Sequence, residues 1–254
     1  MTATSRLIIL HNHLFKNAGT SVDRILRQNF PVQWHTREFP TDRGGNTAGV
    51  SRWIEALPTG IAFSSHTMLG PLPRPEGVTV LPVVLLRDPV DRIASAYRFE
   101  RRQDAQTYGA ILAKQHGFAG YVHARLTLKG DRQCRNFQTS RLASMRPDVG
   151  GSERDRAFAA VRMILREGVL GLVQDFDAAM GRLAARVVPH HPGFTWQPVT
   201  ENASGGGAAQ VVTPEMRAVI EAHNSDDLAL VDYAASLLGQ AETPARTPQA
   251  AGMA

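Results

Sequence analysis

One stretch of this sequence has the residue types and spacing needed to bind an oxyanion. It is Lys16–Ser21 (KNAGTS), which follows the apolar run Leu7–Leu10 and precedes a stretch with apolar residues at helical spacing. A strand, a tight loop and a helix in this order point free backbone N–H groups and the positive end of the helix dipole at an anion. Gly19 allows close approach of the backbone, and Lys16 adds a point charge. The stretch therefore predicts a loop that binds phosphate or sulfate groups.

A second candidate anion site lies where another predicted strand ends. Arg87 directly follows the apolar run Val78–Leu86, and ligands of open α/β sheets bind at the carboxyl ends of the strands. Ser95 lies about two helical turns later, so both side chains can face one ligand. A guanidinium fork and a hydroxyl together suit a phosphate. The alternative is that Arg87 only forms a salt bridge with Asp88 or Asp91 at the helix start and that Ser95 is a packing residue.

The elements that must position these residues follow an α/β pattern. We expect strands at Leu7–Leu10, Gly60–Ser65, about Val83–Leu86 and Gly168–Val173; the third starts late because proline is disfavoured inside a central strand. Helices are expected at Val22–Phe30, Val50–Ala56, Pro89–Arg102, between Thr107 and Arg146 with breaks near Gly117 and Gly130, from Ser152, at Asp175–Val187, Thr213–His223 and Asp226–Leu238. The rest of Pro31–Pro58 is expected to be irregular. We predict one domain over residues 1–239, with a parallel sheet of four or five strands flanked by helices, and a disordered tail over residues 240–254.

Composition and charge limit the class of protein. The chain has 254 residues, is 43% hydrophobic and 20% charged, and carries a net charge of +5, which suits a folded domain with an anionic ligand. Its basic residues form no tract dense enough to favour nucleic acid. A single cysteine, Cys134, excludes a disulfide framework and a cysteine-based zinc site. Because we find no secretory signal pattern and no apolar run of the ~20 residues that a membrane span needs, we expect a cytoplasmic location.

The first loop differs from that of the P-loop nucleotide-binding proteins. Their motif, G-x-x-x-x-G-K-[ST], places the lysine after the second glycine. Here Lys16 precedes Gly19, and no glycine lies five residues upstream of the lysine. This order counts against an ordinary P-loop kinase.

Both candidate anion sites resemble the motifs of one enzyme family. The order Lys-x-x-Gly-Thr-Ser resembles the 5′-phosphosulfate loop of sulfotransferases, close to P-K-x-G-[GS/T]-T, with Phe15 and Ala18 replacing the usual proline and first small residue. Residues 87–97 (RDPVDRIASAY) resemble their 3′-phosphate segment, R-D-P-x-x-R-x-x-S-x-Y. Supporting similarities at residues 132–142, 168–177 and 223–228 extend the resemblance to about residues 6–238. The sequence is thus similar to the 3′-phosphoadenosine 5′-phosphosulfate (PAPS)-dependent sulfotransferases, in the carbohydrate group that contains the heparan and uronyl 2-O-sulfotransferases.

The resemblance implies a fold related to the nucleotide kinases and transfer of a sulfonate group from PAPS to an acceptor hydroxyl. The acceptor is expected to be a saccharide or glycoconjugate, and PAPS, released as 3′,5′-adenosine bisphosphate, is expected to bind without a metal ion. Lys16 is expected to stabilise the leaving group. The residues expected to bind the nucleotide are Lys16, Asn17, Ala18, Gly19, Thr20, Ser21, Arg87 and Ser95.

The acceptor hydroxyl needs a general base, and histidine suits this task near neutral pH. His66, between a predicted strand and a proline-rich loop, resembles in position the histidine base of the 2-O-sulfotransferases. The alternative is a structural histidine that hydrogen-bonds the nucleotide loop. His13 is the second candidate base, and Asp23 and Glu201 are weaker ones.

Other interpretations stay open at this point. The chain is alternatively a P-loop-type nucleotide or small-molecule kinase, or a module that binds a nucleotide without turnover. Gly205–Gly207 forms either a lid or an ordinary surface loop. Arg98, Arg101 and Arg102 either line a groove for an acidic acceptor or form a solvated helix face. The sequence indicates no oligomeric state.

Overall fold

A computed structural model of the protein describes residues 5–41, 44–198 and 212–242. Its centre is a five-stranded sheet in the order β2-β3-β1-β4-β5, and every neighbouring pair of strands is parallel. The strands are β1 (Arg6–Asn12), β2 (Trp34–Thr36), β3 (Ala62–Ser65), β4 (Val78–Leu86) and β5 (Val169–Leu172). The helices are α1 (Gly19–Asn29), α2 (Thr47–Glu55), α3 (Pro89–Arg102), α4 (Tyr108–Gln115), α5 (Phe118–Thr127), α6 (Phe137–Ala143), α7 (Glu153–Glu167), α8 (Phe176–Val187), α9 (Pro214–His223) and α10 (Ser225–Glu242). The predicted α/β fold with a parallel sheet flanked by helices is confirmed.

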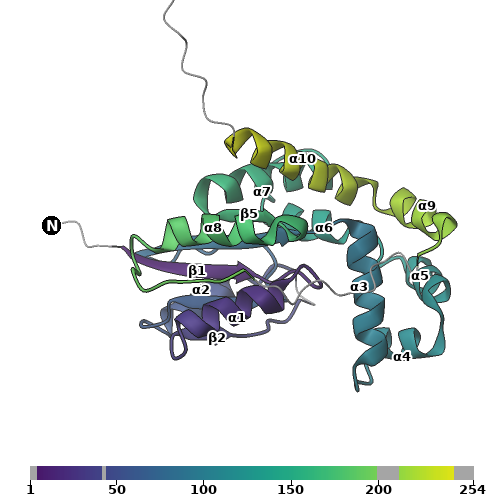
Figure 1. The fold of residues 1–254 in the computed structure, drawn as a ribbon, viewed down its shortest axis with the longest axis horizontal. Coiled ribbons are helices and arrows are strands. Elements are labelled where there is room, and N and C mark those ends of the chain that lie inside the picture. Colours follow the sequence, from purple (N-terminus) through teal and green to yellow (C-terminus); the bar gives the residue numbers. More distant parts are fainter. Residues whose placement is uncertain (1–4, 42–43, 199–211, 243–254) are drawn as a thin grey trace, which may run out of the picture.

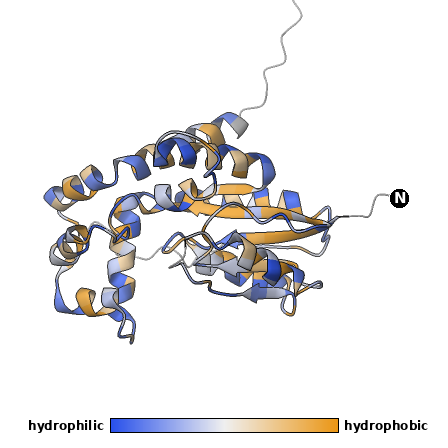
Figure 2. Cartoon of the chain, turned by 180° about the vertical axis from the view of Figure 1, so that it is seen from behind, coloured by the Kyte–Doolittle hydropathy of each residue, from blue (hydrophilic) through white to orange (hydrophobic). Residues whose placement is uncertain are grey.

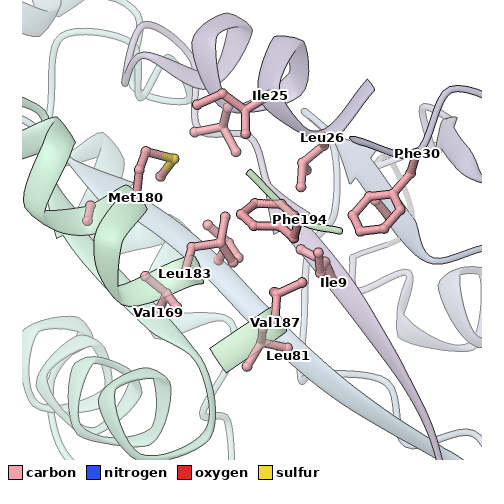
Figure 3. Close-up of a cluster of buried hydrophobic side chains, with 14 of the residues drawn as sticks. Ile9, Ile25, Leu26, Phe30, Leu81, Val169, Met180, Leu183, Val187 and Phe194 are labelled. Carbon is pink, nitrogen blue, oxygen red and sulfur yellow. The ribbon is translucent and has the colours of Figure 1, made fainter. Parts of the chain in front are cut away.

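Helices cover both faces of the sheet (Figure 1). On one face α1 and α8 pack against the strands, as Leu26 and Leu183 do around Ile9 in Figure 3. On the other face α2 covers β1 and β3, and α6, α7 and α10 cover β4 and β5. The strands are accordingly the most uniformly hydrophobic elements in Figure 2, which is typical of a parallel sheet buried on both faces.

A separate group of helices stands beside the carboxyl end of β4 (Figure 1). α3, α4, α5 and α9 share an apolar cluster of their own. A buried ion pair stabilises this group, since the Arg125 guanidinium lies 2.8 Å from a Glu100 oxygen and 2.7 Å from an Asp131 oxygen. The group therefore holds α3, which carries Ser95, in a fixed position against the sheet.

Two predictions about the strands are wrong. β4 begins at Val78 and continues through Pro82, which pairs with Leu10 of β1. The pairing with β5 begins only at Val83, so on that side the missing N–H of Pro82 interrupts no ladder. The other error is β2, a strand in the segment expected to be irregular; three residues at a sheet edge are too few to produce a recognisable period.

Most helix boundaries agree with the predicted ones. The breaks near Gly117 and Gly130 are present, and Ser152 forms a capping box with Asp155 at the start of α7. Asp175 ends a short 3₁₀ turn and provides no side-chain cap for α8, and α10 extends beyond the predicted end, to Glu242.

Three expected features, namely the residue 243–254 part of the tail, the Gly205–Gly207 loop and the candidate base Glu201, lie outside the described residues. In the described part of the chain, no helix is long and apolar enough to cross a membrane.

Candidate active site

The loop after β1 has an unusual backbone. Lys16 and Ala18 both have positive φ angles, 66° and 57°, which non-glycine residues seldom adopt. The chain turns sharply there and enters α1 at Gly19, so the first-turn N–H groups of Gly19 and Thr20 have no acceptor within the helix. The Asn17 N–H instead donates to Leu14 O, at 3.1 Å. The loop thus offers the N–H groups at the start of the helix, together with Lys16, to a ligand.

Almost all of the predicted site residues meet in one pocket of about 210 Å³. Its walls come from the β1–α1 loop with the start of α1, from the segments that follow β3 and β4, and from the middle of α3. The lining residues are His13, Phe15, Lys16, Ala18, Gly19, Thr20, Ser21, His66, Arg87, Ser95, Phe99 and Val173. Among the residues expected to bind the nucleotide, Asn17 is the exception, and the weaker candidate base Asp23 is not part of the lining either. A neighbouring hollow of about 440 Å³ shares Ala18 and Val173 with this pocket and extends along the start of α8.

The pocket is electropositive. Lys16 Nζ lies 4.4 Å from the centre of the Phe99 ring, a cation–π contact that directs the ammonium along one wall. Burial lowers the pKa of Lys16, and the nearby cations Arg87, Arg102 and Arg98 lower it further. A bound anion would offset the repulsion between these positive charges, because it would lie among them.

A buried amide joins the Lys16 loop to the Arg87 loop. The Gln138 side chain, 0% exposed, donates from Nε2 to Arg87 O at 2.7 Å and accepts from the Arg87 N–H at 2.9 Å. Its Oε1 also accepts from Asn17 Nδ2, at 2.7 Å, and the same Asn17 amide donates to Leu85 O. Asn17 therefore anchors the Lys16 loop to the Arg87 loop, and its side chain serves this anchor and not the pocket.

Residues at the start of α10 hold this amide in place. The Asp227 carboxylate at the start of α10 is fully buried and accepts the N–H groups of Gln138 and Thr139, at 3.1 and 2.7 Å. Asn224 accepts the Asn136 N–H at 3.0 Å. These contacts pair the amides of the 132–142 segment with the amide and carboxylates of the 223–228 segment; they cap α6 and so fix Gln138.

Behind the loop, three side chains donate hydrogen bonds to one carboxylate. Asp23 on α1 accepts from His11 Nδ1 at 2.7 Å, His13 Nδ1 at 2.9 Å and the Ser64 hydroxyl at 2.6 Å. Burial alone would raise the pKa of Asp23, but the hydrogen bonds outweigh it and hold the pKa well below its usual value. In the part of the chain that the structure describes, His11, His13 and Asp23 are the one set with metal-ligand spacing. The Asp23 carboxylate, however, already accepts hydrogen bonds from both histidines and from Ser64.

The candidate base His66 lies at the mouth of the pocket. Its side chain is 46% exposed, and its ring centre is 3.8 Å from that of His13. Nδ1 of His66 is 2.9 Å from Glu38 Oε1. Glu38 was not among the predicted residues; it follows β2, the strand that the sequence pattern does not reveal.

The remaining predicted residues have defined positions. Asp88 accepts the Asp91 N–H at 3.0 Å and caps α3, while Arg87 Nη1 donates to Lys16 O at 3.2 Å. Arg101 hydrogen-bonds the Tyr97 hydroxyl and is not among the residues that line the pocket.

Comparison with known proteins gives one informative similarity. No family model matches the chain. The sequence is 34% identical over 197 residues to an uncharacterized protein of Archaeoglobus fulgidus, an alignment that covers 75% of this chain and 77% of the relative. The chain belongs to the same family as this archaeal protein. Because the relative is described only as uncharacterized, the family assignment carries no function with it.

Proposed function

We propose that this protein is a sulfotransferase that moves the sulfonate group of PAPS to an acceptor hydroxyl. The observation that supports this most is that Lys16, Arg87, Ser95 and His66, from three separate segments, line one pocket. Two candidate anion sites and a histidine in one cavity suit a nucleotide that carries phosphate groups at its 3′ and 5′ positions, with an acceptor beside it. The carbohydrate sulfotransferase resemblance of the two motifs points to a saccharide or glycoconjugate as the acceptor.

The residues divide the binding task between them. The start of α1 and Lys16 would hold the 5′-phosphosulfate, because helix N-termini and ammonium groups both favour oxyanions. Arg87 and Ser95 would hold the 3′-phosphate. The neighbouring hollow along the start of α8 has room for the nucleoside, and the two spaces together lie within the ~300–1,000 Å³ typical of small-molecule sites.

The chemistry is an in-line transfer. The acceptor oxygen forms a bond to sulfur as the bond from sulfur to the bridging oxygen breaks, and the bisphosphate leaves. By analogy with phosphoryl transfer, the transition state is loose, so positioned positive charge supplies most of the catalysis. Lys16 would stabilise the departing oxygen, and His66 would accept the proton of the acceptor hydroxyl.

The test is ligand-dependent thermal stability with 3′,5′-adenosine bisphosphate, ADP and ATP. A ligand at 100 times its dissociation constant adds about 2.7 kcal/mol to stability, and ~2–4 °C per kcal/mol for a protein of this size gives a shift of roughly 5–10 °C. We expect the bisphosphate to stabilise most, and Arg87→Ala to remove this preference. Larger stabilisation by ATP with magnesium would support a kinase instead.

Turnover separates an enzyme from a binding module. We expect Lys16→Ala to abolish release of the bisphosphate from PAPS while the folded state is retained. Binding of the bisphosphate without any turnover, and indifference to His66→Ala, would favour a non-catalytic module.

A further inference from the structure

Two carboxylate–imidazole pairs lie side by side in this site. Asp23 holds Nδ1 of His13, and Glu38 holds Nδ1 of His66, at the same distance of 2.9 Å. The two rings are in contact, with their centres 3.8 Å apart and their planes tilted by 30°. Both histidines line the pocket, so each is a candidate to accept a proton there.

Only one of the two rings presents a usable nitrogen. The His13 side chain is 7% exposed, and its Nε2 lies against the loop backbone: a Cβ atom placed on Gly19 would be only 2.2 Å from it. The His66 side chain is 46% exposed. With its Nδ1 bound to a carboxylate, the remaining nitrogen of His66, Nε2, is the one that an acceptor hydroxyl can reach.

The Glu38 carboxylate is itself held in place. It accepts the backbone N–H of His66, with distances of 3.1 and 3.2 Å to its two oxygens, and the Thr67 hydroxyl at 2.7 Å. Burial would raise the pKa of Glu38, but the hydrogen bonds from Thr67 and His66 lower it, so the carboxylate is charged near neutral pH. A charged carboxylate only accepts hydrogen bonds, and therefore requires a proton on Nδ1 of the imidazole.

The backbone on either side of this pair is also fixed. Arg37 N–H donates to Ser64 O at 3.2 Å, and Phe39 N–H donates to the Thr67 hydroxyl at 2.6 Å, which ties the Glu38 segment to the end of β3. From the other side the Arg141 guanidinium donates to the carbonyl oxygens of His66 and Met68, both at 2.7 Å. The His66 imidazole is thus positioned by the Glu38 carboxylate at Nδ1, by contact with the His13 ring and by the hydrogen bonds that fix the His66 backbone.

We propose that Glu38 is the positioning residue of His66: it keeps the proton on Nδ1 and leaves Nε2 unprotonated towards the pocket. This inference rests on the proposed function, since it assigns the general base of that reaction. In the transfer, the proton of the acceptor hydroxyl moves to His66 Nε2 while the acceptor oxygen binds sulfur and the bridging bond breaks. The carboxylate then stabilises the imidazolium that results.

The tautomer of His66 can be measured without any substrate. ¹⁵N-labelled histidine spectra at pH 8.5 distinguish Nδ1–H from Nε2–H, and a His66→Asn variant assigns the signals. We expect the wild-type protein and Glu38→Gln, whose amide oxygen still accepts from Nδ1–H, to show the Nδ1–H tautomer. Glu38→Ala should show both tautomers. The matched control is Glu55→Ala, an exposed glutamate of α2, which should leave the spectrum unchanged.

Turnover gives a second readout. Release of bisphosphate from PAPS, with water or a screened saccharide as acceptor, should fall about 10- to 100-fold in kcat in Glu38→Ala with little change in KM for PAPS, because general-base catalysis contributes 10²–10⁴-fold. Glu38→Gln should lie between Glu38→Ala and the wild type.

The inference is overturned if His66 carries its proton on Nε2, if Glu38→Ala leaves the tautomer unchanged, or if its kcat equals that of the wild type. Failure of the proposed function has a different signature, namely a wild-type protein that does not prefer the bisphosphate over ADP. If the protein prefers the bisphosphate but the His66 tautomer does not depend on Glu38, the proposed nucleotide site stands and only the role of Glu38 is refuted.

Discussion

Replacement of Gln138 by leucine tests how strongly this buried amide holds the Lys16 loop against the Arg87 loop. The change keeps most of the side-chain volume and removes three hydrogen bonds: two to the Arg87 backbone and one from the Asn17 amide. The position is fully buried, so water cannot replace them. A buried polar group without a partner costs about 1–3 kcal/mol.

The lower end of that range, applied to the three polar groups, gives a loss of about 3 kcal/mol in the free energy of unfolding. At ~2–4 °C per kcal/mol for a chain of this size, the melting temperature should fall by roughly 6–12 °C. Affinity for the bisphosphate should fall by at least about tenfold, because Lys16 and Arg87 lie on the two loops that Gln138 joins, and the Arg87–Lys16 and Asn17–Leu85 hydrogen bonds would be left to link them.

The assay is thermal unfolding with and without the bisphosphate, followed by titration calorimetry. The matched control is Gln103→Leu, at a partly exposed glutamine whose side chain donates to the Thr107 hydroxyl over a long distance of 3.4 Å. It should change stability by no more than about 0.5 kcal/mol. Equal shifts for the two variants would refute the role assigned to Gln138.

Three further predictions concern single residues. Gly19→Ala places a Cβ 2.0–2.5 Å from His13 ring atoms, so it should cost about 1–3 kcal/mol and weaken bisphosphate binding in thermal shift, whereas Gly181→Ala, with open space around it, should be neutral or stabilising. Asp23 has a lowered pKa, so its stabilising contribution is full above the unfolded value of about 3.8 and is lost as the pH falls; urea unfolding between pH 5 and 3 should be less pH-dependent in Asp23→Asn. Burial raises the pKa of Cys134 to about 12, so a thiol reagent at pH 8 should label the protein only in urea, and rapid labelling of the native protein would contradict its burial.

The parts of the site that could be predicted depend on short-range patterns. The Lys16 loop needs only a strand, a turn and a helix in sequence, and Arg87 and Ser95 are placed by a strand end and the helical repeat. Their shared pocket also follows, because the carboxyl ends of parallel strands meet at one edge of the sheet.

The parts that could not be predicted depend on long-range pairing. Glu38 reaches His66 only because β2 joins the sheet beside β3, and β2 is too short to be recognised. Gln138 meets Asn17 across 121 residues of sequence, a contact that no local period encodes. At Pro82 a local rule led to a wrong prediction. Proline is disfavoured in central strands, but β4 includes Pro82 because its pairing with β5 starts one residue later, at Val83.

The capping of α6 by Asp227 and Asn224 has a consequence for biosynthesis. A nascent chain that has reached α9 already contains every residue predicted to contact the nucleotide, but lacks the carboxylate that fixes Gln138. The binding loops acquire their final arrangement only when α10 docks. The proposed nucleotide binding therefore requires α10, and we expect a folding intermediate without α10 neither to bind the bisphosphate tightly nor to be stabilised by it.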